Sequence, residues 1–371
     1  QLKKLKFIVL SGFITLLFIA GSNFVHADSA NFTVHPNIGE NQVGESFGYF
    51  NVLLKPKQSQ LLTFTLYNNK TEPIKVSTTF GTAFTSQSGN PGYTPDLVKP
   101  DPSLKINLKD YVTLPRDVTI PAKSSVIVSS RLTMPDQLFS GVIAGGFNFE
   151  AVSSASDHAQ KNGVSITNKY RYVYGLVAQN SLNKVDPVLT LGHVGANQVN
   201  QRNVITAHLT NTEAAYLMQM NTDATVTKYG DKKLNYSYHN AMMEMAPQSS
   251  FDLAIPVSIQ GVLNGKTSEP LKPGKYHLKM VVFGGKDDKG NYQTLLNGKV
   301  TNYDYQWTFE KDFRITGALA STLNKKDATV QKFTIDWLLL IGFAIIFILL
   351  FIIIILLFKR RKNEDDTVKK E

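Results

Sequence analysis

The chain has 371 residues, and its 43% apolar and 11% aromatic content is enough for folded cores, which excludes a wholly disordered chain. The formal net charge is +10, but Lys3, Lys4 and Lys6 supply +3, and six basic and four acidic residues after position 358 supply +2. Residues 28–336 hold 30 basic and 25 acidic residues, so their charge does not indicate a nucleic-acid partner. Cysteine is absent, which excludes disulfides and most zinc sites.

The N-terminus has the pattern of an export signal. Three lysines precede an apolar run over residues 7–20, and Val25-His26-Ala27 offers the small side chains that a signal peptidase needs. The run is too short to cross a bilayer. We therefore expect residues 1–27 to be a signal peptide.

The C-terminus has the pattern of a membrane anchor. Residues 337–358 contain no charge, and at about 1.5 Å per residue they would form about 33 Å of helix. Basic residues 359–362 follow directly, so the positive-inside rule predicts a cytoplasmic tail at 359–371 and an extracellular domain before the helix. No Leu-Pro-x-Thr-Gly sorting site precedes this segment. The sequence thus predicts a single-pass cell-membrane protein, with residues 319–336 as a juxtamembrane linker.

Between these ends, apolar and polar residues alternate in short runs that end at turn residues. Residues 62–67 alternate and stop at Asn68-Asn69-Lys70, and residues 204–210 stop in the same way at Asn211-Thr212-Glu213. This period is typical of half-buried strands. We predict an all-β fold with two Ig-like β-sandwich domains in tandem, plus the C-terminal transmembrane helix. The expected domains are 28–152 and 163–318, joined by a polar linker at 153–162.

The sequence shows no catalytic or metal-binding motif. None of the seven histidines has a partner at metal-ligand spacing, and no nucleophile elbow, P-loop or dinucleotide fingerprint occurs. Asp287-Asp288-Lys289-Gly290-Asn291 is interpreted as a hairpin turn, with a calcium loop as the less favoured alternative. We therefore expect a protein that is not an enzyme and has no cofactor or metal, although a pair of carboxylates that meets only in space stays open.

Several motifs, in this order, resemble the WxL-interacting proteins of Gram-positive bacteria. The motifs of the first half are Phe32-Thr33-Val34-His35-Pro36, Gly48-Tyr49-Phe50-Asn51-Val52, Val118-Thr119-Ile120-Pro121-Ala122 and Phe139-Ser140-Gly141-Val142-Ile143-Ala144-Gly145-Gly146. Those of the second half are Tyr170-Arg171-Tyr172-Val173-Tyr174-Gly175, Leu271-Lys272-Pro273-Gly274-Lys275-Tyr276 and Trp307-Thr308-Phe309. The resemblance covers nearly the whole chain.

The resemblance implies a peptidoglycan-binding first domain and a host-binding second domain. The implied partners are peptidoglycan, a WxL-domain surface protein and a host extracellular-matrix protein. We therefore expect a membrane-tethered adhesion scaffold on the cell surface. The alternative is a chaperone-like assembly factor that accepts a strand from a WxL protein at an open sheet edge. A wall-degrading enzyme is a third hypothesis.

Two sets of residues are candidates for these contacts. Glycans are bound by aromatic rings and amides, which makes Asn41, Gln42 and Tyr93 the glycan-binding candidates. Tyr93 is also compatible with a loop residue packed on its own sandwich. The candidates for a partner interface combine aromatics and flexible thioethers: Tyr236, Tyr238, His239, Met242 and Met243. The same segment is equally compatible with a core strand and its edge.

Overall fold

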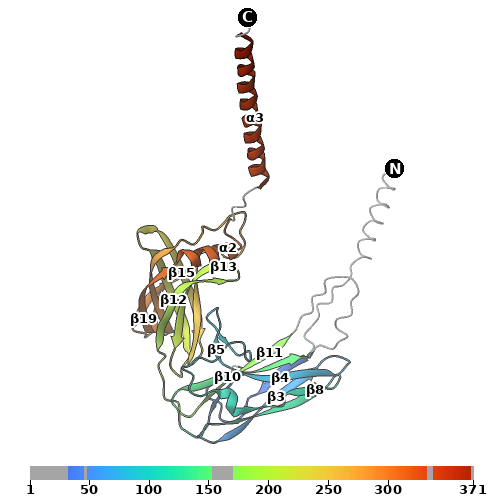
Figure 1. The fold of residues 1–371 in the computed structure, drawn as a ribbon. Helices are drawn as coiled ribbons and strands as arrows, with labels where there is room; N and C mark the ends of the chain where they lie inside the picture. Colours follow the sequence, from blue (N-terminus) through green and yellow to red (C-terminus); the bar gives the residue numbers. More distant parts are fainter. Residues whose placement is uncertain (1–31, 46–47, 153–169, 332–336, 369–371) are drawn as a thin grey trace, which may run out of the picture.

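The computed structural model describes residues 32–45, 48–152, 170–331 and 337–368. The predicted signal peptide at 1–27 and the predicted linker at 153–162 lie outside these residues. Figure 1 shows two β-sandwiches in contact, with one short helix on the second and a long helix extending away from both.

The first sandwich consists of a four-stranded and a five-stranded sheet. The four-stranded sheet has the order β1 (Phe32–Asn37), β3 (Ser59–Asn68), β9 (Ser125–Thr133) and β7 (Val112–Thr113). The five-stranded sheet has the order β2 (Phe50–Leu53), β11 (Arg171–Gln179), β10 (Val142–Ala151), β4 (Ile74–Thr82) and β8 (Asp117–Ile120). A short hairpin of β5 (Phe84–Thr85) and β6 (Pro91–Gly92) and the 3-10 helix η1 (Leu108–Tyr111) lie in the β4–β7 connection.

Phenylalanine rings fill the first core. Phe64 on β3 meets Phe147 and Phe149 on β10 edge to face, at centroid distances of 4.9 and 4.8 Å. All three side chains are fully buried. Edge-to-face contact adds about 0.5–1.5 kcal/mol per pair to the energy of burial, so these rings join the two sheets.

β11 belongs to the first sandwich, although the predicted boundary at residue 163 would assign it to the second. It pairs antiparallel with β10, from Val142 opposite Gln179 to Glu150 opposite Arg171, and parallel with β2. The hydroxyl of Tyr172 on β11 donates to the carbonyl oxygen of Phe32 across the core, 2.9 Å away. By hydrogen bonding, the first sandwich thus extends to Gln179.

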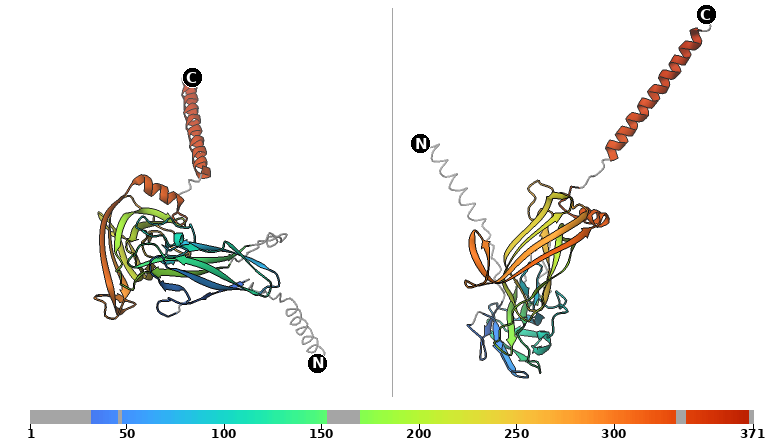
Figure 2. Two further views of the ribbon diagram at one scale, coloured as in Figure 1. Left: turned by 90° about the horizontal axis from the view of Figure 1, so that it is seen from below. Right: turned by 90° about the vertical axis from the view of Figure 1, so that its left-hand side faces the viewer.

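The second sandwich has a three-stranded and a five-stranded sheet. The first contains β12 (Leu189–Val199), β13 (Arg202–Asn211) and β16 (Ser249–Pro256). The second has the order β15 (Asp231–Met245), β14 (Leu217–Lys228), β17 (Gly274–Lys286), β19 (Lys299–Ile315) and β18 (Tyr292–Leu296). Its core is aliphatic and thioether-rich, with Met220, Met280 and Leu278 fully buried. The hairpin of β18 and β19 projects from the side of the molecule (Figure 2).

A helix and a buried carboxylate close one end of the second sandwich. In α2 (Gly317–Lys326), Ala320 and Leu323 pack on the second core. Asp327 follows, and its carboxylate accepts hydrogen bonds from the Asn203 backbone N–H, the Ser258 hydroxyl and Thr329. Burial opposes ionisation of Asp327, but these bonds outweigh it and hold the pKa of the carboxyl below its ordinary value. Within the predicted juxtamembrane linker at 319–336, the segment as far as Val330 is thus docked on the second sandwich.

The helix α3 (Trp337–Val368) corrects the predicted membrane anchor at 337–358. In the part of the chain that is described, no helix is long and apolar enough to cross a membrane. Among the described residues, the fold is all-β with two α-helices, α2 and α3. By the finding on membrane spans, the predictions of a transmembrane helix and of a single-pass membrane location are wrong.

Candidate binding surfaces

On the outer side of the β1-β3-β9-β7 sheet, strands β1 and β3 carry side chains rich in hydroxyl groups. Because side chains alternate along a strand, burial of Val34, Phe64 and Leu66 inside turns their neighbours outward. The register sets Thr33 beside Tyr67, His35 beside Thr65, and Asn37 beside Thr63. We call these six residues the threonine face: Thr33, His35, Asn37, Thr63, Thr65 and Tyr67.

Hydrogen bonds and a ring contact fix the side chains of the threonine face. The Asn37 amide donates to the hydroxyls of Thr63 and Thr65, at 3.2 and 3.1 Å. The ring of His35 lies 5.6 Å from that of Tyr67, edge to face. Tyr67 still has 41% of its surface exposed. The face therefore presents an exposed ring beside ordered hydroxyl and amide groups, which is the chemistry that a sugar ring and its hydroxyls require.

Asn41 and Gln42, two predicted glycan ligands, hold the loop between β1 and β2. Asn41 has a φ of 60°, and its amide donates to the side chain of Gln60 at 3.0 Å. The Gln42 side chain accepts from the Asn51 backbone N–H at 3.0 Å and donates to the Tyr49 carbonyl oxygen at 3.3 Å. Their polar atoms are thus engaged within the first sandwich.

Tyr93, the third predicted glycan ligand, lies at the junction of the two sandwiches. Its carbonyl oxygen accepts from the Asn148 amide at 2.8 Å, and its hydroxyl lies 3.2 Å from that of Tyr216 in the second sandwich. Gly146 on β10 makes room for its ring, because a Cβ there would lie 2.6 Å from the Tyr93 Cβ. Burial raises the pKa of Tyr93. Tyr93 therefore joins the sandwiches instead of facing solvent, and it is not on the threonine face.

The junction is a close contact with its own hydrogen bonds. The hydroxyls of Thr85 and Ser249 lie 2.5 Å apart, and the Thr85 hydroxyl also accepts from the Ala246 backbone N–H at 3.0 Å. The Val142 backbone N–H donates to the Ala214 carbonyl oxygen at 2.7 Å. This approach requires glycine at position 141, where φ is 79° and a Cβ would lie 2.1 Å from that oxygen. These contacts fix the two sandwiches relative to each other.

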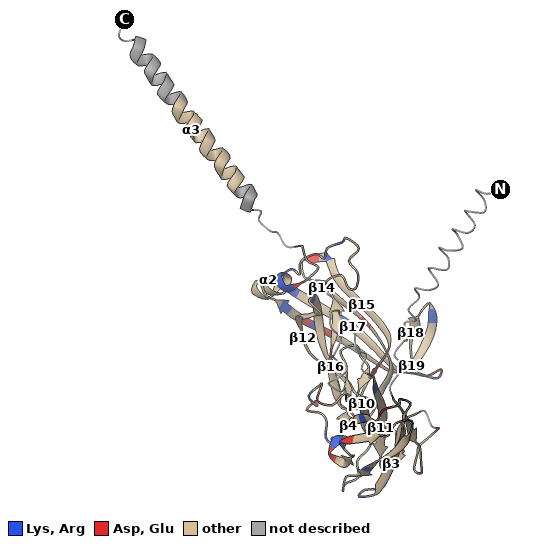
Figure 3. Ribbon diagram, turned by 90° about the vertical axis from the view of Figure 1, so that its right-hand side faces the viewer, with Lys and Arg blue, Asp and Glu red and all other residues tan. Residues whose placement is uncertain are grey.

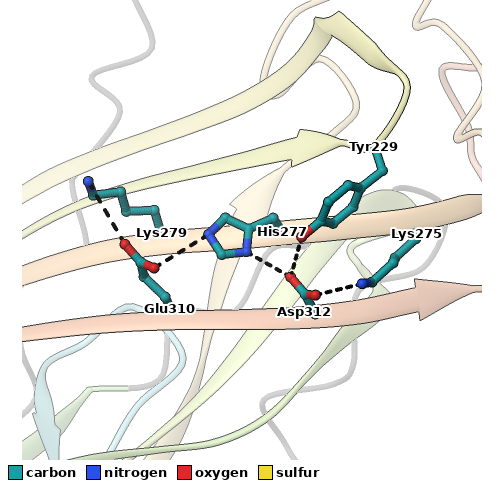
Figure 4. A network of polar contacts seen from close by, with 6 residues as sticks. All are labelled: Tyr229, Lys275, His277, Lys279, Glu310 and Asp312. Carbon is teal, nitrogen blue, oxygen red and sulfur yellow. Dashed lines mark hydrogen bonds and ion pairs between the residues drawn. The ribbon is translucent and has the colours of Figure 1, made fainter.

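The outer side of the β14-β17-β19 sheet carries a charged face (Figure 4). Asp312 lies at its centre and contacts His277 Nδ1 at 2.8 Å, Lys275 Nζ at 2.7 Å and the Tyr229 hydroxyl at 2.9 Å. Glu310 lies 3.9 Å from His277 Nε2 and 3.9 Å from Lys279 Nζ. We call these residues the ionic face: Tyr229, Lys275, His277, Lys279, Glu310 and Asp312.

The charges of the ionic face are set by their neighbours. Lys275, His277 and Tyr229 all stabilise the ionised carboxylate of Asp312, and they hold its pKa well below the ordinary range. The same bond to Asp312 raises the pKa of Lys275. Figure 3 shows charged positions spread over both sandwiches, including a basic end of α2 that contains Lys325 and Lys326. The ionic face is therefore distinguished by its pairing and not by an excess of one sign.

The five predicted partner-interface residues divide between core and surface. Tyr236 stacks on Tyr276 at 6.4 Å, and the Tyr238 hydroxyl donates to the buried sulfur of Met243 at 3.5 Å. His239 points outward, and its Nδ1 lies 2.6 Å from Asp223. Met242 is 62% exposed with a φ of 67°, next to irregular pairing of β15 with β14. Only His239 and Met242 are thus available to a partner.

Sequence reasoning missed the threonine face and the ionic face, although one signal for the first was present. The alternation of residues 62–67 predicts that Thr63, Thr65 and Tyr67 share one side of a strand. The pairing of His277 with Asp312 depends on the register of β17 with β19, which the spacing of two distant residues does not reveal. No cluster of three or more metal-ligating side chains occurs among residues that the structure describes.

Two family models match the chain, in the predicted order. The WxL Interacting Protein peptidoglycan binding domain matches residues 32–151, and the WxL Interacting Protein host binding domain matches residues 161–325. Together they cover more than half of the chain, which confirms the resemblance seen in the sequence. No curated protein matches the chain.

The solved structures that match the chain include fimbrial chaperones. The class 5 fimbriae chaperone CfaA is 15% identical with a TM-score of 0.30, covering 76% of this chain and 99% of its own. The E. coli chaperone DraB is 13% identical with a TM-score of 0.27, covering 77% of this chain and 97% of its own. These values are too low to support any conclusion about function.

Proposed function

Because the chain belongs to the WxL-interacting protein family, we propose that it is an adhesion scaffold. In this proposal its first domain binds peptidoglycan, and its second domain binds a WxL protein or a host extracellular-matrix protein. The observation that carries the proposal is the succession of the two family domains along one chain. The rigid junction adds support, because it would transmit force from one bound partner to the other.

The threonine face is the proposed peptidoglycan surface. A sugar ring can stack on exposed Tyr67, while its hydroxyls exchange hydrogen bonds with Asn37 and Thr65. The three side chains are already held by their neighbours, so little conformational entropy would be lost on binding. A neutral face also suits a polymer whose glycan strand offers mainly hydroxyl and amide groups.

The ionic face is the proposed protein-binding surface. Its alternating charges can be matched by a partner of complementary pattern, which gives specificity and faster association. His239 and Asp223 extend the polar surface onto β14 and β15. A partner lying across these strands would contact charges that are exposed and already oriented.

Sedimentation with insoluble peptidoglycan tests the proposal. The full chain is mixed with purified peptidoglycan, centrifuged and measured in pellet and supernatant. We expect most of the chain in the pellet, and competition by soluble glycan fragments. A chain that stays in the supernatant at every peptidoglycan concentration would contradict the role of the first domain.

The edge strand β18 favours one alternative, in which the chain accepts a strand from a WxL protein. β18 ends the five-stranded sheet, and the cross-strand pair of Leu295 and Val300 is 65% and 67% exposed. Replacing Gln293 by proline would remove a backbone N–H that faces the open edge, and so would block added pairing there. If the variant still binds a WxL protein as tightly as the unmodified chain, strand addition at β18 is wrong.

A further inference from the structure

A pocket of about 320 Å³ lies at the junction, with walls from both sandwiches. The first sandwich contributes Lys105, Phe139 and Ile143, and the second contributes Glu213 and Gln248. Val185, from the segment that joins the sandwiches, completes an apolar lining. This volume is at the lower end of the range for ligand pockets, about 300–1,000 Å³. It therefore suits a ligand the size of a short peptide.

Hydrogen bonds hold the polar groups of the pocket in place and leave hydrogen-bonding capacity for a ligand. Gln248 is only 5% exposed, and its backbone N–H donates to the Glu213 carbonyl oxygen at 3.0 Å. Its side-chain oxygen accepts from the Lys105 backbone N–H at 3.4 Å, which turns the side chain toward the Lys105 wall of the pocket. A ligand oxygen that enters the pocket could accept a hydrogen bond from the Gln248 amide.

Lys105 and Glu213 give the pocket one charge of each sign. Within the described residues neither takes part in an ion pair, and Glu213 receives only a weak hydrogen bond from Thr212, at 3.4 Å. A carboxylate near Lys105 and an ammonium group near Glu213 would both gain a partner. The lining of Phe139, Ile143 and Val185 also favours small apolar groups. The ligand class is a short peptide with both charges and small side chains.

We propose that this pocket binds the uncross-linked end of a peptidoglycan stem peptide. Such an end offers a free carboxylate on a terminal D-alanine and, in lysine-type walls, a free side-chain amine. The carboxylate would face Lys105 and the Gln248 amide, and the amine would face Glu213. The inference rests on the proposed peptidoglycan-binding function and extends it. In this arrangement the pocket binds the stem peptide while the threonine face binds the glycan strand.

The site needs both sandwiches in their observed arrangement. Lys105 and Glu213 belong to different sandwiches, and the hydrogen bond from Val142 to Ala214 holds the walls together. Binding a stem peptide would therefore stabilise the junction, by the linkage that favours any state to which a ligand binds. Wall contact in the first domain would in this way be coupled to the position of the second.

Titration of the full chain with Nα-acetyl-Lys-D-Ala-D-Ala, followed by calorimetry, tests the proposal. The controls are the same peptide with an amidated C-terminus and the same peptide acetylated on the lysine side chain. We expect the unmodified chain to bind the free peptide about tenfold more tightly than either control, because each control removes a charge-assisted hydrogen bond. Lys105→Met should abolish only the preference over the amidated peptide, and Glu213→Gln only the preference over the acetylated one.

The outcomes separate this proposal from the proposed function. If the full chain sediments with peptidoglycan but binds no tripeptide at millimolar concentration, the pocket proposal is overturned and wall binding stands. If the tripeptide binds but both variants retain the preferences of the unmodified chain, it binds elsewhere and the pocket proposal is again overturned. If the chain does not sediment at all yet binds the tripeptide with the expected preferences, the pocket is supported and the threonine face loses its role.

Discussion

The outer sheet faces of the two sandwiches differ in how they would hold a ligand. On the threonine face, amide and hydroxyl groups hold one another, and the exposed ring of Tyr67 carries no charge. On the ionic face, Asp312 and Glu310 are each paired across strands with cations. Exposed charges are screened within about 8 Å at physiological salt, whereas stacking and neutral hydrogen bonds are not. Binding at the threonine face should therefore depend little on salt, and binding at the ionic face should depend on it strongly. This difference suits a glycan polymer on the first face and a protein partner on the second.

The largest expected effect comes from breaking the contact that sets the two faces relative to each other. Gly141→Ala places a Cβ 2.1 Å from the Ala214 carbonyl oxygen and also strains a backbone with a φ of 79°. We expect a loss of about 2–4 kcal/mol in the free energy of unfolding, from overpacking of about 1–3 and left-handed backbone of about 1. Thermal or urea unfolding of the full chain measures it.

Gly44→Ala is the matched control for this substitution. Gly44 has a φ of 75°, but nothing lies within 4 Å of the position of its added Cβ. It should therefore lose only the backbone part, about 1 kcal/mol. Equal losses in the two variants would show that the junction tolerates the extra carbon, and that the two faces are not fixed by this contact.

The next effect sharpens the role assigned to the threonine face. Tyr67→Ala removes the exposed ring, and we expect sedimentation with peptidoglycan to weaken about tenfold, or about 1.4 kcal/mol. Tyr292→Ala is the control, since Tyr292 on β18 is equally exposed at 41% but lies on the second sandwich. If Tyr67→Ala and Tyr292→Ala weaken sedimentation equally, peptidoglycan does not bind preferentially to the threonine face of the first sandwich.

A smaller effect is expected on the ionic face. Lys279→Glu reverses a charge beside Glu310, and we expect binding of a protein partner to weaken about fivefold at physiological salt and less at 0.5 M salt. Lys99→Glu makes the same change of charge on an exposed loop of the first sandwich and should leave binding unchanged. Surface plasmon resonance with WxL and matrix proteins measures both. Equal weakening would mean that only net charge matters.

The strands of both sandwiches could be predicted from alternation, but the partition of the strands could not. Burial alternates along β3 as the pattern of residues 62–67 predicts, because that pattern is local. β11 looks like the first strand of the second domain, yet its hydrogen bonds join it to β10 and β2. Strand pairing is a long-range property, so the sequence around 153–162 did not reveal which sheet β11 joins.

The candidate sites show the same limit. Tyr93 follows a polar loop, which indicates exposure, but its surroundings depend on Tyr216, 123 residues away. Irregular pairing leaves Met242 exposed and Met243 buried. The sequence alone does not predict which of the two methionines is exposed. The apolar run at 337–358 predicted a membrane helix from composition, and this prediction was wrong by the finding for the described helices. The sequence therefore indicates which side chains are chemically able to bind a ligand, whereas their exposure and their neighbours are known only from the fold.

The smallest expected effect is a change in the pH dependence of stability when Asp312 is replaced. Lys275, His277 and Tyr229 hold the pKa of Asp312 below the value of 3.8 that an ordinary aspartate has. The stabilisation from these contacts is therefore complete above about pH 4, and it is lost as the pH falls through the lower, folded-state pKa. Asp312→Asn should be slightly less stable at pH 7 and should lose less stability between pH 4 and pH 2.

Asp136→Asn, which removes a carboxylate that one exposed lysine contacts at 3.6 Å, should keep the pH profile of the unmodified chain. The measurement is the thermal unfolding midpoint of the three chains between pH 2 and pH 7. Identical pH profiles would show that the contacts of Asp312 on the ionic face contribute nothing to the stability of the fold.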